Sequence, residues 1–251
     1  MTGDVRIIVL GLIAAGVSAV LGWLARSRLS KHRLRREQAF FGLPENAESL
    51  LVVNRDANGP EQSVVRHDVS ALIELAGVIR ECGAHAQIVA HDAAQQSFGE
   101  RTEFCVGSPV ANRRMAAHMH SLLPGVRVNT EPEPIPDRGA FQVGPDRYRL
   151  EAGLTEYVLL ARLTVDRGQE TRPVFLFCGQ RAVASQAAAR HLARHHEKLA
   201  RKYGANAFVL LLKVVNSQAY GPDVVELVAD VTRAARTPLP VPSARTSHRA
   251  K

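Results

Sequence analysis

Three short segments place glycine, serine, asparagine and charged residues directly after apolar runs that favour β-strands. They are Asn54-Arg55-Asp56, then Gly107-Ser108-Pro109 with Asn112 one helical turn later, and Gly179-Gln180 with Ser185 beyond. Glycine lets a ligand approach the backbone closely, and the N–H groups at the start of a helix attract an anion. The three segments therefore predict a crevice that binds a nucleotide or another small anionic ligand.

The same residue types also build turns and helix caps without any ligand, so a purely structural role for these segments stays open. The chain contains neither the GxxxxGK[ST] loop of P-loop NTPases nor the GxGxxG pattern of dinucleotide-binding domains. It also lacks the GxSxG and HExxH patterns of common hydrolases. Catalytic residues therefore stay unknown, and no cofactor is expected.

Histidines on a long predicted helix suggest a metal at first sight. His191 and His195 have the four-residue spacing of a chelating pair, and His196 stands beside Glu197. Basic residues crowd the same helix and repel a cation; they are Arg190, Arg194, Lys198, Arg201 and Lys202. We therefore expect a solvated basic face and no metal site.

The three cysteines are far apart in the sequence and form no CxxC pair; they are Cys82, Cys105 and Cys178. This spacing argues against a structural zinc site or a disulfide framework, and lone thiols suit a reducing cytosol. Cys105 and Cys178 each lie at the end of a predicted strand, where we expect an inert, buried thiol.

Short apolar runs alternate with amphipathic ones along most of the chain. We expect strands at 50–54, 86–91, 103–106, 126–129, 157–165, 173–178, 207–215 and 224–232, a hairpin at 141–150, and helices at 68–82, 108–123 and 181–203. Asp68 and Ser108 are the expected N-caps, and the strands at 157–165 and 173–178 are expected to pair antiparallel. The alternation predicts a Rossmann-like, three-layer α/β sandwich with a mostly parallel, partly mixed sheet.

The N-terminus carries an apolar run with charges on one side. Residues 7–25 contain no charged residue, and an α-helix of that length rises about 28 Å, close to the thickness of a bilayer core. Basic residues follow immediately; they are Arg26, Arg28, Lys31, Arg33, Arg35 and Arg36. By the positive-inside rule, we expect a single-pass anchor in the cell membrane with the N-terminus outside and the remaining chain in the cytoplasm.

The charge is distributed unevenly. The net charge of +8 comes from +6 in residues 1–36 and +3 in residues 237–251, which leaves residues 37–236 at −1. A nucleic-acid-binding domain needs a concentrated basic surface on its fold, so we expect no nucleic-acid partner. The basic cluster after the apolar run favours anionic lipid headgroups instead.

These patterns divide the chain into five parts. We expect an extracytoplasmic N-terminus at 1–6, a transmembrane helix at 7–25, a basic juxtamembrane segment at 26–43, a cytosolic α/β domain at 44–236 and a disordered, proline-containing tail at 237–251. Gly11, Ala15 and Ala19 repeat every four residues, a spacing that lets two membrane helices pack, so a homodimer is one alternative.

Gly107-Ser108-Pro109-Val110-Ala111-Asn112, the segment Cys178–Arg190 and Tyr220-Gly221-Pro222 resemble a group of uncharacterised bacterial proteins. That group has an N-terminal transmembrane segment and an α/β domain with a Gly-Gly-Pro-x-x-Asn-like turn. Here Ser108 replaces the second glycine. The resemblance implies the same α/β fold, and the group has no established activity that could be carried over.

Three functions follow from the sequence as alternatives. The first is a membrane-anchored sensor or regulatory module that binds a small anion in its cytosolic domain. The second is an enzyme that acts on a nucleoside or glycosidic bond in the same crevice. The third is an interaction scaffold that recruits partners to the membrane.

Overall fold

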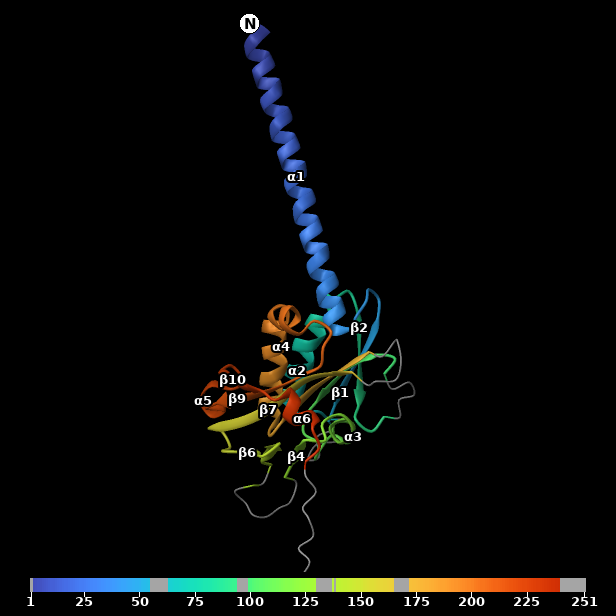
Figure 1. Cartoon of the computed structure of the whole chain (residues 1–251), viewed down its shortest axis with the longest axis vertical. Coiled ribbons are helices and arrows are strands. Elements are labelled where there is room, and N and C mark those ends of the chain that lie inside the picture. The colour runs from blue at the N-terminus through green and yellow to red at the C-terminus, as the bar shows by residue number, and fades with distance from the viewer. Residues whose placement is uncertain are drawn as a thin grey trace, which may run out of the picture.

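The computed structural model describes residues 2–54, 63–93, 99–129, 137, 139–164 and 172–239; within the first helix, the side chains of residues 2–17, 19, 21 and 25 are not described. Its centre is a seven-stranded sheet in the order β10-β9-β7-β8-β3-β1-β2 (Figure 1). The strands are β1 (Glu48–Val53), β2 (His85–Ala90), β3 (Thr102–Val106), β7 (Thr155–Thr164), β8 (Pro173–Gly179), β9 (Phe208–Val215) and β10 (Val225–Asp230).

The sheet is mixed but mostly parallel. Strands β2, β1, β3 and β8 pair in parallel, whereas β7 is antiparallel to both β8 and β9, and β10 is antiparallel to β9. Strand β9 therefore runs in the same direction as β8, and only β7 and β10 of this sheet run against it. The predicted α/β class and the antiparallel pairing of β7 with β8 are confirmed.

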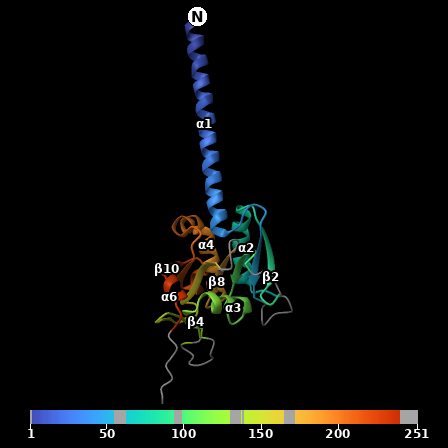
Figure 2. The same ribbon diagram turned by 45° about the vertical axis from the view of Figure 1, so that its right-hand side comes forward.

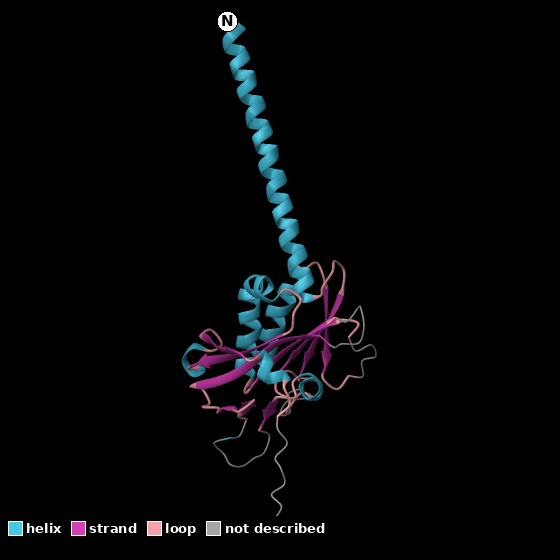
Figure 3. Cartoon of the chain, viewed as in Figure 1, coloured by secondary structure: helices cyan, strands magenta, loops and turns pink. Residues whose placement is uncertain are grey.

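Each face of the sheet is covered by a separate hydrophobic cluster. On one face lie α2 (Arg66–Glu81) and α4 (Ala182–Tyr203), which pack against each other (Figures 2 and 3). The other face carries α3 (Arg113–Leu122), α6 (Thr232–Arg236) and a small antiparallel sheet of β4 (Val126–Val128), β5 (Phe141–Val143) and β6 (Asp146–Tyr148). The third layer therefore combines helices with a small sheet.

Two local predictions are wrong. Helix α3 begins at Arg113 with Asn112 as its N-cap, whose side-chain oxygen accepts from the N–H of Met115 at 2.8 Å, so Ser108 is not the cap. Helix α2 begins at Arg66, and its N-cap Val65 makes no side-chain cap; Asp68 lies inside the first turn. The predicted strand at 126–129 exists as β4, but it pairs with β5 in the small sheet.

Helix α1 (Thr2–Phe41) is continuous and projects from the α/β body, with its N-terminus at the far end (Figure 1). Its last residues belong to the core, because Phe40 and Phe41 are 1% and 0% exposed. Where the structure describes side chains, it contains no helix that is long and apolar enough to span a bilayer. Most of the predicted span at 7–25 lies outside those residues.

The C-terminal end of α1 is fastened by side chains from the sheet. Arg162, 2% exposed, donates from Nε to the carbonyl of Phe40 at 2.7 Å and also reaches the carbonyl of Ala205. The Thr102 hydroxyl is 3.0 Å from the carbonyl of Phe41. These donors satisfy carbonyls that have no partner within a helix, so α1 leaves the domain in a defined direction.

Candidate functional site

The three predicted junctions lie along one edge of the sheet, which is formed by the carboxyl ends of its parallel strands. Strands β1, β3 and β8 are adjacent and parallel, so Asn54, Gly107 and Gly179 stand at neighbouring carboxyl ends. Gly107 has a φ of +116°, and a Cβ there would overlap the side-chain amide of Asn54. Only glycine suits this close approach. Arg55 and Asp56 lie outside the described residues.

Asn54 in turn contacts a buried carboxylate at the start of α2. Its Nδ2 lies 3.4 Å from Oδ2 of Asp68, which is 1% exposed. Burial raises the pKa of Asp68 to about 6, although the charge of His67 and the hydrogen bond from Asn54 act against that rise. Among the described residues, the Oδ1 atoms of Asn54 and Asp68 have no hydrogen-bond partner. This carboxylate is therefore poorly compensated.

Other predicted site residues are engaged by the backbone around them. The side chain of Asn112 donates to the carbonyl of Val106 at 3.0 Å while its oxygen caps α3. Ser185 Oγ accepts from the N–H of Gly179 at 3.2 Å, and the carbonyl of Ser108 accepts from Ala111 and Asn112 in a turn. Their polar groups form turns and a helix cap, which is the purely structural role considered for these segments above.

Gln180 connects the two sheets. Its Oε1 accepts from the N–H of Tyr157 at 2.8 Å, and its Nε2 donates to the carbonyls of Gly139 and Tyr148. These three contacts hold the small sheet against β7. Gln180 therefore positions the segment that carries its neighbour, Arg181.

A polar cavity of about 530 Å³ lies beside this edge. Its wall comes from the starts of α2 and α4, from the loop before β7, and from α5 (Ser217–Tyr220) after β9. The lining residues are Arg66, His67, Ala152, Gly153, Arg181, Val183, Ser217, Gln218 and Gly221. We call this cavity the basic pocket, because three of its side chains are basic.

The direction of the strands explains why these segments meet. Because β7 is antiparallel to β8, its start lies beside the end of β8, with Val158 opposite Gly179. Strand β9 runs parallel to β8, and its last residue Val215 pairs with Thr155. The loop before β7 and the residues after β9 therefore arrive at the same sheet edge as the start of α4.

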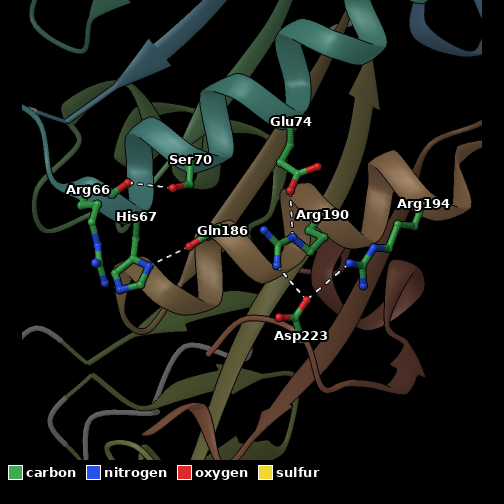
Figure 4. A network of polar contacts seen from close by, with 8 residues as sticks. All are labelled: Arg66, His67, Ser70, Glu74, Gln186, Arg190, Arg194 and Asp223. Atoms are coloured by element: carbon green, nitrogen blue, oxygen red, sulfur yellow. Dashed lines mark hydrogen bonds and ion pairs between the residues drawn. The ribbon is translucent and has the colours of Figure 1, made fainter. Parts of the chain in front are cut away.

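The α2 side of the pocket carries Arg66 and His67, whose side chains lie next to each other (Figure 4). Nδ1 of His67 is 2.7 Å from Oε1 of Gln186 on α4. Since an amide oxygen only accepts, this contact places the ring proton on Nδ1 and orients the imidazole. Arg66 is exposed, and its backbone carbonyl accepts from Ser70.

The α4 side is organised by Glu156, which is 0% exposed. Its Oε1 accepts from Nη1 of Arg181 at 2.8 Å, from the hydroxyl of Ser217 at 2.7 Å and from the N–H of Gly153 at 3.1 Å. The side chain of Arg181 is 48% exposed, and a guanidinium has five N–H donors. Glu156 therefore fixes Arg181 while other donors of that side chain remain for a ligand.

Both helices enter the pocket without a side-chain cap. The N-caps Val65 and Arg181 are extended, and neither side chain accepts a hydrogen bond from its helix. The first N–H groups of a helix have no partner within it and carry the positive end of the helix dipole. Two such ends and three basic side chains make this pocket suited to a phosphate or carboxylate group.

The thiols at the strand ends take no part in this chemistry. Cys82, Cys105 and Cys178 are buried and unpaired. Burial raises the pKa of Cys178 to about 12 and also raises that of Cys105. Because the thiolate is the nucleophile, neither of these two residues is poised for covalent chemistry.

No protein-family model, curated protein or solved structure matches this chain. The functional argument therefore depends on the geometry of the basic pocket. Arg66, His67, Arg181 and Ser217 were not among the predicted site residues, although two signals pointed to the three basic ones. Arg181 directly follows Gly179-Gln180, and Arg66 and His67 directly precede Asp68.

Proposed function

We propose that the α/β domain binds a small anionic ligand of the phosphate or nucleotide class in the basic pocket, as a sensor or regulatory module. The observation that carries this proposal is the convergence of Arg66, His67 and Arg181 on one cavity at the uncapped starts of α2 and α4. Its volume of about 530 Å³ lies within the range of small-molecule sites. A guanidinium matches a phosphate with two parallel hydrogen bonds, which favours Arg66 and Arg181 as its ligands.

We further propose that residues 7–25 anchor the protein in the cell membrane, with the α/β domain in the cytoplasm. Behind this run, α1 presents Arg26, Arg28, Lys31, Arg33 and Arg35 as exposed side chains and Arg36 as a half-buried one. From residue 25 to Phe40 a continuous helix rises about 22 Å. The domain would then stand off from the bilayer on a basic helix that contacts anionic headgroups.

Ligand binding is tested with the full chain in a mild detergent and a panel of inorganic phosphate, nucleoside monophosphates, nucleoside triphosphates and cyclic nucleotides. A ligand that binds only the folded state raises the melting temperature, and calorimetry then gives its Kd. Arg66→Gln is the informative variant, because no described side chain pairs with Arg66 and folding should be unaffected. Loss of one charged hydrogen bond predicts a Kd about tenfold weaker.

Arg201→Gln is the matched control, because it removes an exposed arginine at the other end of α4. An equal loss of affinity in both variants would show that binding reflects net charge alone. If no compound of the panel shifts the melting temperature at millimolar concentration, the ligand class is wrong. The enzyme and scaffold hypotheses stay predictions.

Membrane anchoring has its own test. A C-terminal reporter that is active only in the cytoplasm should be active in the full chain, and the protein should remain in the membrane fraction after a high-salt wash. Deletion of residues 2–25 should release it into the soluble fraction. An inactive reporter would reverse the orientation, and a soluble full chain would refute the anchor.

A further inference from the structure

A second group of ligand-type side chains lies far from the basic pocket, where α1 meets α4. Glu37 of α1 and His196 and Glu197 of α4 each place one donor atom within 4.8 Å of the other two. Glu37 and His196 are 6% and 8% exposed. Two carboxylates and an imidazole are a donor set that zinc and related divalent ions accept.

The imidazole of His196 is oriented as in metal sites. Its Nδ1 lies 2.8 Å from the carbonyl of Ala193, which can only accept, so the ring proton is on Nδ1 and the lone pair is on Nε2. A hydrogen bond of this kind from the second ring nitrogen to a carbonyl usually accompanies metal-ligating histidines. The tautomer that a metal requires is therefore already in place.

A carboxylate oxygen lies near Nε2. Nε2 lies 3.7 Å from Oε1 of Glu37, which is longer than a hydrogen bond. Two ligands about 2.1 Å from a tetrahedral metal ion are separated by about 3.4 Å. The observed separation suits two atoms that share an ion better than two atoms that share a proton.

Arg33 holds the two carboxylates together. Its Nε contacts Oε1 of Glu37 at 3.0 Å, and its Nη2 pairs with Oε1 of Glu197. The Arg33 side chain is 56% exposed, whereas that of Glu37 is 8% exposed. The guanidinium thus approaches Glu37 from the solvent side. A divalent ion in its place would balance both carboxylate charges.

Part of the positive charge that argued against a metal on this helix is paired with carboxylates. Arg190 pairs with Glu74 and with Asp223 at 2.8 and 2.7 Å, and Arg194 also contacts Asp223 (Figure 4). Further acidic charge lies close to the junction, because the carboxylate of Glu81 acts on Arg33. On the side that faces α1, His196 therefore lies beside the carboxylates of Glu37 and Glu197, with Arg33 as the cation that contacts both.

We propose that Glu37, His196 and Glu197 bind a zinc-like divalent ion that displaces Arg33 and joins α1 to α4. The site needs the fold, since Glu37 comes from a different helix. It goes beyond the proposed anion binding and does not depend on it.

The test uses the full chain without a histidine tag, in detergent, with Zn²⁺ alone as the probe. Equilibrium dialysis with metal analysis should give one bound ion per chain, and Zn²⁺ should raise the melting temperature. His196→Ala should weaken binding at least tenfold, as loss of a ligand or its orienting group does. Arg33→Gln should tighten binding, because it removes the competing cation from an exposed position.

His195→Ala is the matched control, since it removes the neighbouring histidine on the same helix. His191 and His195 lie with ring centroids 4.4 Å apart and would chelate zinc independently of α1. If His195→Ala abolishes binding and His196→Ala does not, zinc is held by that surface pair and the proposal is wrong. Weaker or unchanged binding in a folded Arg33→Gln variant, which keeps all three metal ligands, also overturns it.

Discussion

The substitution Asp68→Asn should stabilise the protein, and its effect should depend on pH. Burial raises the pKa of Asp68 from 3.8 to about 6 in the folded state. One pKa unit corresponds to about 1.4 kcal/mol, so the ionised carboxylate costs about 3 kcal/mol above pH 7. With the side chain 1% exposed, solvent screening does not reduce this figure. A favourable helix-dipole interaction of about 0.5 kcal/mol opposes it.

The sign follows from proton binding. Between pH 6 and pH 4 the folded state holds a proton that the unfolded state has released, so the penalty disappears as the pH falls through this window. Asparagine has the same shape and no charge. Asp68→Asn should therefore be more stable than the parent chain by about 2 to 3 kcal/mol at pH 8, with the difference vanishing near pH 4.

Pulse proteolysis in urea measures this difference, because it reports the folded fraction without an optical probe. Trp23 is the single tryptophan of the chain and lies on α1, 69% exposed, so its fluorescence would not follow the unfolding of the sheet. An equal or lower stability of Asp68→Asn at pH 8 would show that a partner compensates the buried carboxylate. A difference independent of pH would refute the titration argument.

Three further predictions concern buried groups of the α/β domain. Arg114→Ala should cost about 3 kcal/mol in urea unfolding, because it strips a bidentate ion pair from Glu103, whose side chain is 3% exposed. Burial alone would raise the pKa of Glu103, but hydrogen bonds from His118 and Arg114 lower it. Ionised Glu103 therefore stabilises the fold above pH 4.5, and this contribution is lost on further acidification. Unchanged acid stability in Arg114→Ala would contradict this. Gly107→Ala should lower stability by about 2 kcal/mol more than Gly204→Ala, because both glycines have positive φ but only Gly107 has a side chain against its Cβ position; equal losses would exclude the role of Asn54. In the native state a thiol reagent should label no cysteine at neutral pH, whereas three should react in denaturant, and rapid native labelling would disprove the burial of Cys82, Cys105 and Cys178.

The strands were predictable because their apolar runs are short and bounded by turn residues. The run that becomes β1 was expected at 50–54 and spans Glu48–Val53. The start of α3 was not predictable, since Ser108 and Asn112 are equally suitable caps. The structure selects Asn112, whose amide also reaches the carbonyl of Val106 at the end of β3, and the sequence pattern does not show this contact.

The position of the candidate site was partly predictable. Parallel strands bring the residues after β1, β3 and β8 to one edge, and the sequence identified that edge through Asn54, Gly107 and Gly179. The basic pocket also needs Glu156 and Ser217, which come from the start of β7 and from α5, directly after β9. Their arrival depends on strand directions and order, which local sequence patterns do not encode.

Helix α4 connects the two proposed sites. Its N-cap is Arg181 at the basic pocket, and it carries His196 and Glu197 about four turns later, some 22 Å along its axis. Ala184, Ala187 and Ala188 on its buried face are 0% exposed, and such small side chains let the helix lie close to the sheet. A helix packed in this way is expected to move as a rigid element, so that a shift at one end displaces the other end.

Arg162 and Thr102 fix the end of α1 to the sheet. If a metal displaces Arg33, the resulting movement would therefore fall on α4. Any coupling between the basic pocket and the metal junction would pass through the position of α4, and reciprocity requires each ligand to change the other's Kd by the same factor.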